Sequence, residues 1–200
     1  MNLEYLGDAL DHWKGSLFDY LQARANLRDF AVDPMATDRE HWSEADFSLF
    51  ARLLHIERSQ IIPHEASLRN RSQYFGEIKH RGDIFLDPDT GIATSGSSSR
   101  MKYVRPVELA TILDFDHRPV VSVYQHIRAQ KTCMRVDGCV AATLRKIAAE
   151  WCSYESPTVA MLFFCKDGTR ICEIAEALRQ LLGKHAERRV RTGKVASSEK

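Results

Sequence analysis

The sequence lacks the features that mark several specialised classes of protein. Its 200 residues contain only five cysteines, none of them in a Cys-x-x-Cys pair. An odd number of cysteines without that spacing argues against both a disulfide framework and a zinc knuckle. No apolar run approaches the roughly 20 residues that a membrane-spanning helix needs. We therefore expect reduced thiols in a cytoplasmic protein that makes no use of a membrane.

Familiar targeting and nucleotide-binding signals are missing as well. The first eight residues lack the basic stretch and apolar run of a signal peptide. The chain contains no G-x-x-x-x-G-K-[ST], G-x-G-x-x-G, G-x-S-x-G or H-E-x-x-H motif. The first expected strand, Phe30 to Val32, is followed by Asp33 and Pro34, where a dinucleotide-binding protein has glycine.

Composition is that of an ordinary globular protein, with 44% hydrophobic and 28% charged residues. The formal net charge of +1 hides a basic segment from Lys184 to Lys194, which holds five basic residues and one acid. The length suits a single domain, which we place at residues 1–190. Residues 191–200 are expected to form a disordered basic tail.

Hydrophobic periodicity predicts helices that alternate with strands. Apolar residues recur at helical spacing near the start of the chain, and continuous apolar runs typical of doubly buried strands follow. The expected helices span 5–24, 43–54, 64–79, 106–113, 132–151 and 169–182; the expected strands span 30–32, 60–62, 83–86, 120–123 and 158–164. This alternation is typical of an α/β protein with a mostly parallel, twisted sheet and helices on both faces.

Polar residues follow two of these strands directly. Asp87 and Asp89 come after the strand 83–86, and Tyr124 and His126 come after the strand 120–123. Ligands of parallel sheets bind beyond the carboxyl ends of the strands, so this set is suited to bind a cation, relay a proton or hold a base. The competing interpretation is that Asp-Pro-Asp-Thr-Gly is only a good turn sequence. A carboxylate that ends an apolar strand needs a partner, which favours a function for Asp87.

A second candidate group lies on the first helix. Gly7, Asp11 and Lys14 share one helical face, and Gly7 suggests that something approaches the helix closely there. The alternative is that Asp11 and Lys14 form an ordinary surface ion pair. If they share a site with the strand residues, Asp87, Asp89 and Lys14 should lie within about a hydrogen bond or two of one another.

Basic residues near the second strand are candidates for phosphate contacts. Arg128, Lys131 and Arg135 follow the Tyr-Gln-His segment, and the Lys184–Lys194 segment adds further positive charge. Such residues bind the backbone of nucleic acids. A solvated charged face is the alternative interpretation.

Two segments together resemble an uncharacterised bacterial family. Its members begin with a Tyr-x-Gly-Asp-x-x-Asp-x-x-Lys pattern, here Tyr5 to Lys14. They also carry Phe-Leu-Asp-Pro-Asp-x-Gly, here Phe85 to Gly91, and a later Tyr-x-His, here Tyr124 to His126. The spacing fits over most of the chain, but no established activity comes with this family.

The same segments more distantly resemble the ribosomal-RNA adenine-N6 methyltransferases. Those enzymes have an Asp-x-x-Lys-His helix, matched here by Asp11 and Lys14, and an Asp-Pro-Pro-Tyr motif, matched by Asp87 and Pro88. The resemblance implies a three-layer, Rossmann-like, methyltransferase-like fold. It also implies that Asp11 and Lys14 lie near an S-adenosylmethionine cofactor and that Asp87 grips the target amine.

This chain departs from the methyltransferase motif at two positions. Asp89 and Thr90 stand where the family has its second proline and its aromatic residue, and Tyr124 is the candidate to replace that aromatic against a flipped base. Three functions follow as hypotheses: an S-adenosylmethionine-dependent enzyme acting on nucleic acid, a Mg²⁺-dependent nuclease or phosphodiesterase using Asp87 and Asp89, and a non-catalytic binding module. The sequence does not determine the oligomeric state.

Overall fold

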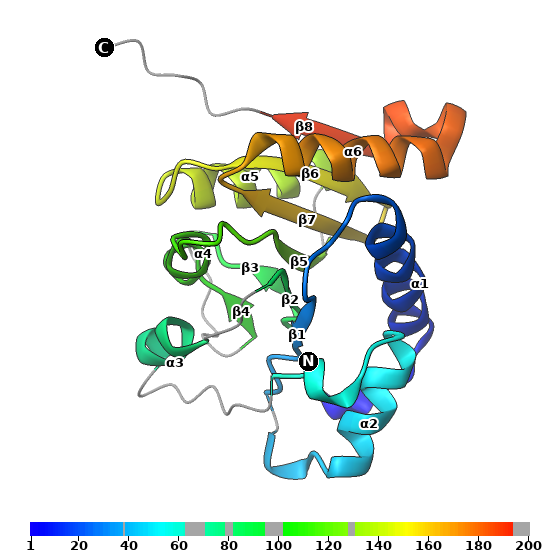
Figure 1. Cartoon of the computed structure of the whole chain (residues 1–200), viewed down its shortest axis with the longest axis vertical. Helices are drawn as coiled ribbons and strands as arrows, with labels where there is room; N and C mark the ends of the chain where they lie inside the picture. Colours follow the sequence, from blue (N-terminus) through cyan, green and yellow to red (C-terminus); the bar gives the residue numbers. More distant parts are fainter. Residues whose placement is uncertain (38, 63–70, 79–81, 95–101, 128–130, 194–200) are drawn as a thin grey trace.

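The computed structural model describes residues 1–37, 39–62, 71–78, 82–94, 102–127 and 131–193 (Figure 1). Its six α-helices in this part of the chain are α1 (Ala9–Arg24), α2 (Glu44–Leu53), α3 (Arg71–Glu77), α4 (Pro106–Leu113), α5 (Thr132–Leu144) and α6 (Gly168–Leu182). Four short 3-10 helices, η1 to η4, span Leu3–Tyr5, Arg39–His41, Arg58–Gln60 and Gly183–Arg188. No helix in the described ranges is long and apolar enough to cross a membrane.

Six strands form one mixed sheet in the order β1-β2-β5-β7-β6-β8. They are β1 (Ala31–Asp33), β2 (Ile84–Leu86), β5 (Val121–His126), β7 (Val159–Cys165), β6 (Glu150–Glu155) and β8 (Val190–Gly193). β1, β2 and β5 are parallel, whereas β7 is antiparallel to both β5 and β6, and β8 is antiparallel to β6. Four of the six strands therefore point the same way. A small second sheet pairs β3 (Gly91–Ile92) with β4 (Tyr103–Val104).

Each face of the main sheet carries its own hydrophobic core. Every residue of β7 is buried, and because side chains alternate along a strand, Met161 and Phe163 join one core while Leu162 and Phe164 join the other. Buried residues of α1, α2 and α6 belong to the first core, and those of α3, α4 and α5 to the second. The predicted α/β class with helices on both faces is therefore confirmed (Figure 1).

The second half of the chain differs from the prediction. The helix expected over 132–151 ends at Leu144, and residues 150–155 form strand β6 instead. Trp151 and Tyr154 suit a strand, and pairing with β7 along six residues outweighs the weak helical pattern. Part of the expected disordered tail is also ordered, since residues 191–193 belong to β8; residues 194–200 lie outside the described part of the chain.

Smaller corrections affect the first half. The strand expected at 60–62 is a single bridge between Ile61 and Val32, preceded by η3. The helix expected over 64–79 is described only as α3, because residues 63–70 and 79–81 lie outside the described ranges. The first helix starts at Ala9 rather than Tyr5.

A buried ion pair fixes the amino-terminal edge of the parallel strands. Asp83, just before β2, accepts both guanidinium hydrogen bonds of Arg170 from α6, at 2.8 and 2.6 Å. The same carboxylate accepts the backbone N–H groups of Arg28 and Val120, which precede β1 and β5. One side chain thus aligns three neighbouring strands, so that their carboxyl ends meet at the opposite edge.

Candidate functional site

A cavity of about 490 Å³ opens at the carboxyl edge of β1, β2 and β5. Its volume lies in the range of small-molecule sites. The six predicted site residues all line it: Asp11, Lys14, Asp87, Asp89, Tyr124 and His126. Residues more than 100 positions apart in the sequence are thereby brought together, as expected for ligands of parallel strands.

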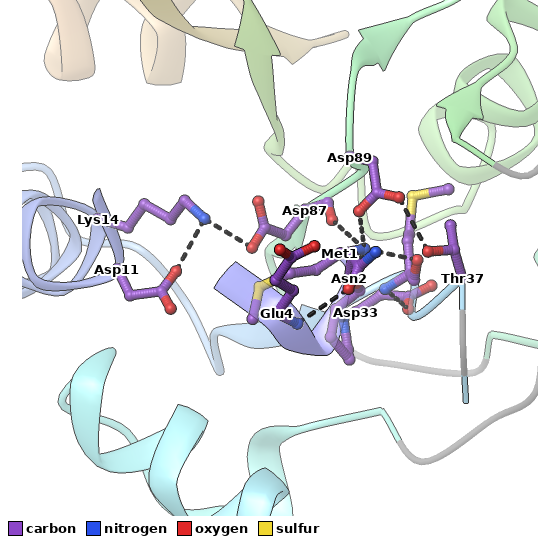
Figure 2. A network of polar contacts seen from close by, with 11 residues as sticks. Met1, Asn2, Glu4, Asp11, Lys14, Asp33, Thr37, Asp87 and Asp89 are labelled. Carbon is purple, nitrogen blue, oxygen red and sulfur yellow. Dashed lines mark hydrogen bonds and ion pairs between the residues drawn. The ribbon is translucent and has the colours of Figure 1, made fainter. Parts of the chain in front are cut away.

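Lys14 lies at the buried end of this cavity and pairs with two carboxylates. Its Nζ donates to Asp11 Oδ1 at 3.0 Å and to Asp87 Oδ2 at 2.8 Å (Figure 2). The same ammonium lies over the ring of Tyr124, 4.5 Å from its centroid, a favourable cation–π contact. Burial alone would lower the pKa of this ammonium. The charges of Asp87 and Asp11 raise it by more than burial lowers it, so the pKa of Lys14 lies above its usual value.

The start of α1 places Asp11 and Lys14. Asp8 caps the helix by accepting the backbone N–H groups of Leu10 and Asp11, and Asp11 Oδ2 accepts the N–H of Gly7 at 2.9 Å. Gly7 has a φ of 88°, which favours glycine, and nothing lies within 4 Å of the position that a Cβ would take. The expectation of a close approach at Gly7 is therefore wrong: the glycine is needed for backbone conformation.

Burial raises the pKa of Asp11, although the neighbouring Lys14 ammonium opposes this effect. A surface ion pair between these two residues is excluded, because both are almost fully buried. The pair instead forms the floor of the cavity together with Asp87.

Asp87 continues β2 into the cavity. Its backbone N–H donates to Asp33 O at 3.0 Å, so the strand pairing extends one residue past Leu86. One carboxylate oxygen, Oδ2, accepts from Lys14, and the other points away from Lys14 (Figure 2). No donor among the described residues contacts that second oxygen, Oδ1, which leaves it as an acceptor for a ligand.

Asp89 is held differently from Asp87. Its Oδ1 lies 3.2 Å from the amino group of Met1, and its Oδ2 accepts from Thr37 Oγ1 at 2.9 Å (Figure 2). The Met1 amino group also donates to the carbonyl oxygens of Pro34 and Met35 at 2.7 Å and of Asp87 at 3.1 Å. Burial lowers the pKa of this amino group. Asp89 therefore joins the 87–91 loop to the segment that follows β1.

Asp33, which ends β1, is a buried acid that the sequence did not single out. It accepts the Tyr74 hydroxyl at 2.5 Å and the N–H of Met35 at 2.8 Å. Burial raises the pKa of Asp33, against the effect of both hydrogen bonds. The signal that would have found it is the one used for Asp87, an acid directly after an apolar strand.

Gln125 was also not assigned a role of its own. Fully buried, it donates from Nε2 to Thr90 O at 2.9 Å and accepts at Oε1 from the N–H of Ile92 at 2.8 Å. It thus binds the backbone on both sides of Gly91 and ties the 87–91 loop to β5. Gly91 has a φ of 115°, and a Cβ there would lie 2.2 Å from Gln125 Oε1. Only glycine fits against this amide.

Tyr124 and His126 lie on the cavity side of β5, because alternate residues of a strand share a face. Their rings meet edge to face, with centroids 4.8 Å apart and planes at 87°. One face of Tyr124 already carries the Lys14 ammonium. That face is not available to stack on a base, which weakens the predicted replacement of the methyltransferase aromatic by Tyr124.

Those of the basic residues proposed for phosphate contacts that the structure describes do not line this cavity. Arg135 donates to Thr94 Oγ1 and Ile92 O, and Arg191 pairs with Glu155 and Asp137. Arg128 lies outside the described residues, and Lys131 is exposed. Among the described residues, the basic side chain that lines the cavity besides Lys14 is Lys102, which the sequence gave no reason to choose.

The carboxylates of the site do not form a metal centre. No group of three or more His, Cys, Asp or Glu side chains in the described part of the chain is arranged to hold a metal ion. Asp87 and Asp89 each face an ammonium or amino group instead. Asp89 is thus engaged at both of its carboxylate oxygens, and Asp87 at one of its two.

No model of a protein family, no curated protein and no solved structure matches this chain.

Proposed function

We propose that the protein is a binding module that recognises the amino group of a nucleobase in the cavity. The observation that carries this proposal is Oδ1 of Asp87, which no donor among the described residues contacts, while Lys14 fixes the other oxygen of the same carboxylate. A carboxylate acceptor selects ligands that carry N–H donors, such as the amino groups of adenine or cytosine. Three rings line the same cavity, those of Tyr5, Tyr124 and His126, which suits a flat heterocycle.

Methyl transfer to that amino group is the activity implied by the resemblance to adenine-N6 methyltransferases, and the residues present do not fit its cofactor. S-adenosylmethionine would be expected beyond the first parallel strand, against a glycine-rich turn. Beyond β1 stands Pro34-Met35, and Met1 is buried against the carbonyl groups of these two residues. Lys14 is already paired with Asp11 and Asp87. We therefore do not assign methyl transfer to this site.

A three-layer, Rossmann-like classification is part of this proposal. It is supported by the three parallel strands and by helices on both faces of the sheet. The methyltransferase-like subtype has less support, because β1, β2 and β5 follow one another without the reversal of strand order that creates a nucleotide-binding crevice.

The decisive test compares adenosine with inosine, which carries a carbonyl oxygen in place of the amino group. Isothermal titration calorimetry should show adenosine binding, with inosine weaker by about tenfold or more, because two acceptors then face each other. Asp87→Asn should reverse or abolish this preference, since an amide can donate to the inosine oxygen.

The matched control is Asp137→Asn, the same change at an exposed residue that pairs with Arg191. It should leave the adenosine preference unchanged. Circular dichroism confirms that each variant is folded before titration. Equal affinity of the wild-type protein for adenosine and inosine, or no binding of either, would contradict the proposal.

A further inference from the structure

Lys102 differs from the other cationic groups that line the cavity. Lys14 is paired with Asp11 and Asp87, and the Met1 amino group contacts four oxygen atoms. Lys102 is exposed, and no described carboxylate pairs with it. Among the described residues that line the cavity, Lys102 therefore carries the positive charge that is available to a ligand.

The backbone of Lys102 is fixed beside the loop that carries Asp87. The carbonyl oxygen of Lys102 accepts the N–H of Thr90 at 2.9 Å, and β4, which follows Lys102, pairs with β3. The backbone of Lys102 is therefore hydrogen-bonded to the same loop that carries Asp87. The cavity offers an acceptor at its floor and a cation on an exposed residue.

Tyr5 adds an exposed aromatic ring to the same lining. It is 58% exposed, and of the large apolar side chains exposed in the described residues it is the one that lines this cavity. Its helix, η1, is held by Asn2, whose side chain accepts the N–H of Glu4 (Figure 2). Exposed aromatic side chains are common stacking surfaces for nucleobases.

From this arrangement we infer that the ligand is a nucleoside monophosphate unit with an amino-bearing base. The inference rests on the proposed function and names its ligand class: the base amino group meets Asp87, the base stacks on Tyr5, and the phosphate pairs with Lys102. Glu4 and Asp8 also line the cavity. These carboxylates add negative charge to the lining, so we expect a triphosphate to bind more weakly than a monophosphate.

The test titrates the full chain with adenosine, adenosine 5′-monophosphate, adenosine 5′-triphosphate and ribose 5-phosphate. The monophosphate should bind about tenfold more tightly than adenosine, because a charge-assisted contact is added. Lys102→Ala should remove that gain and leave adenosine binding unchanged. Lys166→Ala, at a surface lysine that pairs with Asp114, is the matched control and should keep the gain.

Tyr5→Ala should weaken adenosine and the monophosphate by the same factor, without affecting ribose 5-phosphate. A 5′-phosphorylated single-stranded oligoadenylate shows whether the ligand is a free nucleotide or the end of a nucleic-acid strand. If it binds more tightly than the monophosphate, the ligand is a strand end; if it binds more weakly, the ligand is a free nucleotide.

The inference is overturned if the monophosphate binds no more tightly than adenosine, or if Lys102→Ala keeps the gain. In both cases adenosine binding itself would remain, and the proposed function with it. If neither adenosine nor the monophosphate binds, the proposed function fails together with this inference.

Discussion

Replacing Lys14 with methionine should destabilise the folded protein strongly. Methionine keeps much of the length of the side chain but removes the ammonium, and Asp11 and Asp87 then remain as buried carboxylates without a counterion. At an effective dielectric constant of about 20, unit charges 2.8 Å apart attract by roughly 6 kcal/mol before desolvation is subtracted. Measured losses on removing one partner of a buried pair are about 3–5 kcal/mol. We expect a loss in that range.

Urea-induced unfolding followed by circular dichroism measures this loss at neutral pH. Such a loss is a large part of the roughly 5–15 kcal/mol that holds a typical domain folded, so a milder variant is useful. Asp11→Asn keeps an oxygen for the N–H of Gly7 and leaves Lys14 paired with Asp87. It should cost about 1–2 kcal/mol.

The triple variant Asp11→Asn, Lys14→Met, Asp87→Asn is the control for charge. It removes all three charges together, so it should be clearly more stable than Lys14→Met alone. A loss below about 1 kcal/mol for Lys14→Met would refute the view that Lys14 neutralises a buried acid pair. A triple variant no more stable than the single one would refute it too, since packing rather than charge would then explain the loss.

The free energy of unfolding measured at alkaline pH tests the same contact. The pKa of the Lys14 ammonium is raised above its ordinary value of 10.5, so above that pH the folded protein holds a proton that the unfolded chain has lost. The contribution of Lys14 is therefore complete below pH 10.5 and is lost as the pH rises through the folded pKa. The difference in unfolding free energy between the wild-type protein and Lys14→Met should shrink over this alkaline range. A constant difference would contradict the assignment.

For three further substitutions, the structure predicts whether the folded protein is stabilised or destabilised. Gly15→Ala would normally stabilise a helix, but here the new Cβ lies 2.0 Å from Leu53 O, so thermal unfolding should shift to lower temperature. Gly91→Ala should destabilise by more than about 1 kcal/mol, and less so in a Gln125→Ala background, which a double-mutant cycle in urea measures. Arg170→Met leaves a buried carboxylate unpaired at the start of β2 and should cost about 3–5 kcal/mol in the same urea assay.

The sequence predicted those elements whose local signals agree with the final packing. The helix Pro106–Leu113 was placed correctly because proline opens it and a regular apolar pattern follows. Strand β7 was found within a residue because every position is apolar. By contrast, β6 mixes buried and partly exposed residues without regular alternation, and β8 is only four residues long. Their existence depends on pairing with a neighbouring strand, which a local pattern does not contain.

The same distinction applies to the site. Asp87 was identified because a carboxylate after an apolar strand needs a partner, and Lys14 because it shares a helical face with Gly7 and Asp11. The amide of Gln125 and the contacts of Met1 were not, because nothing near them in the sequence indicates burial. Their partners, Thr90 and Asp89, are at least 35 residues away along the chain.

Lys14 and Asp87 have different roles in the site, because their hydrogen-bonding groups are used differently. Both were predicted as members of one site, with Lys14 near a cofactor and Asp87 near a target amine. Lys14 donates to both Asp11 and Asp87 and lies over the ring of Tyr124, so its effect on a ligand is through the position of Asp87. Asp87 keeps one oxygen, and its orientation is set by the other. Lys14 is thus a positioning residue, and the selectivity of the cavity for N–H donors follows from Asp87.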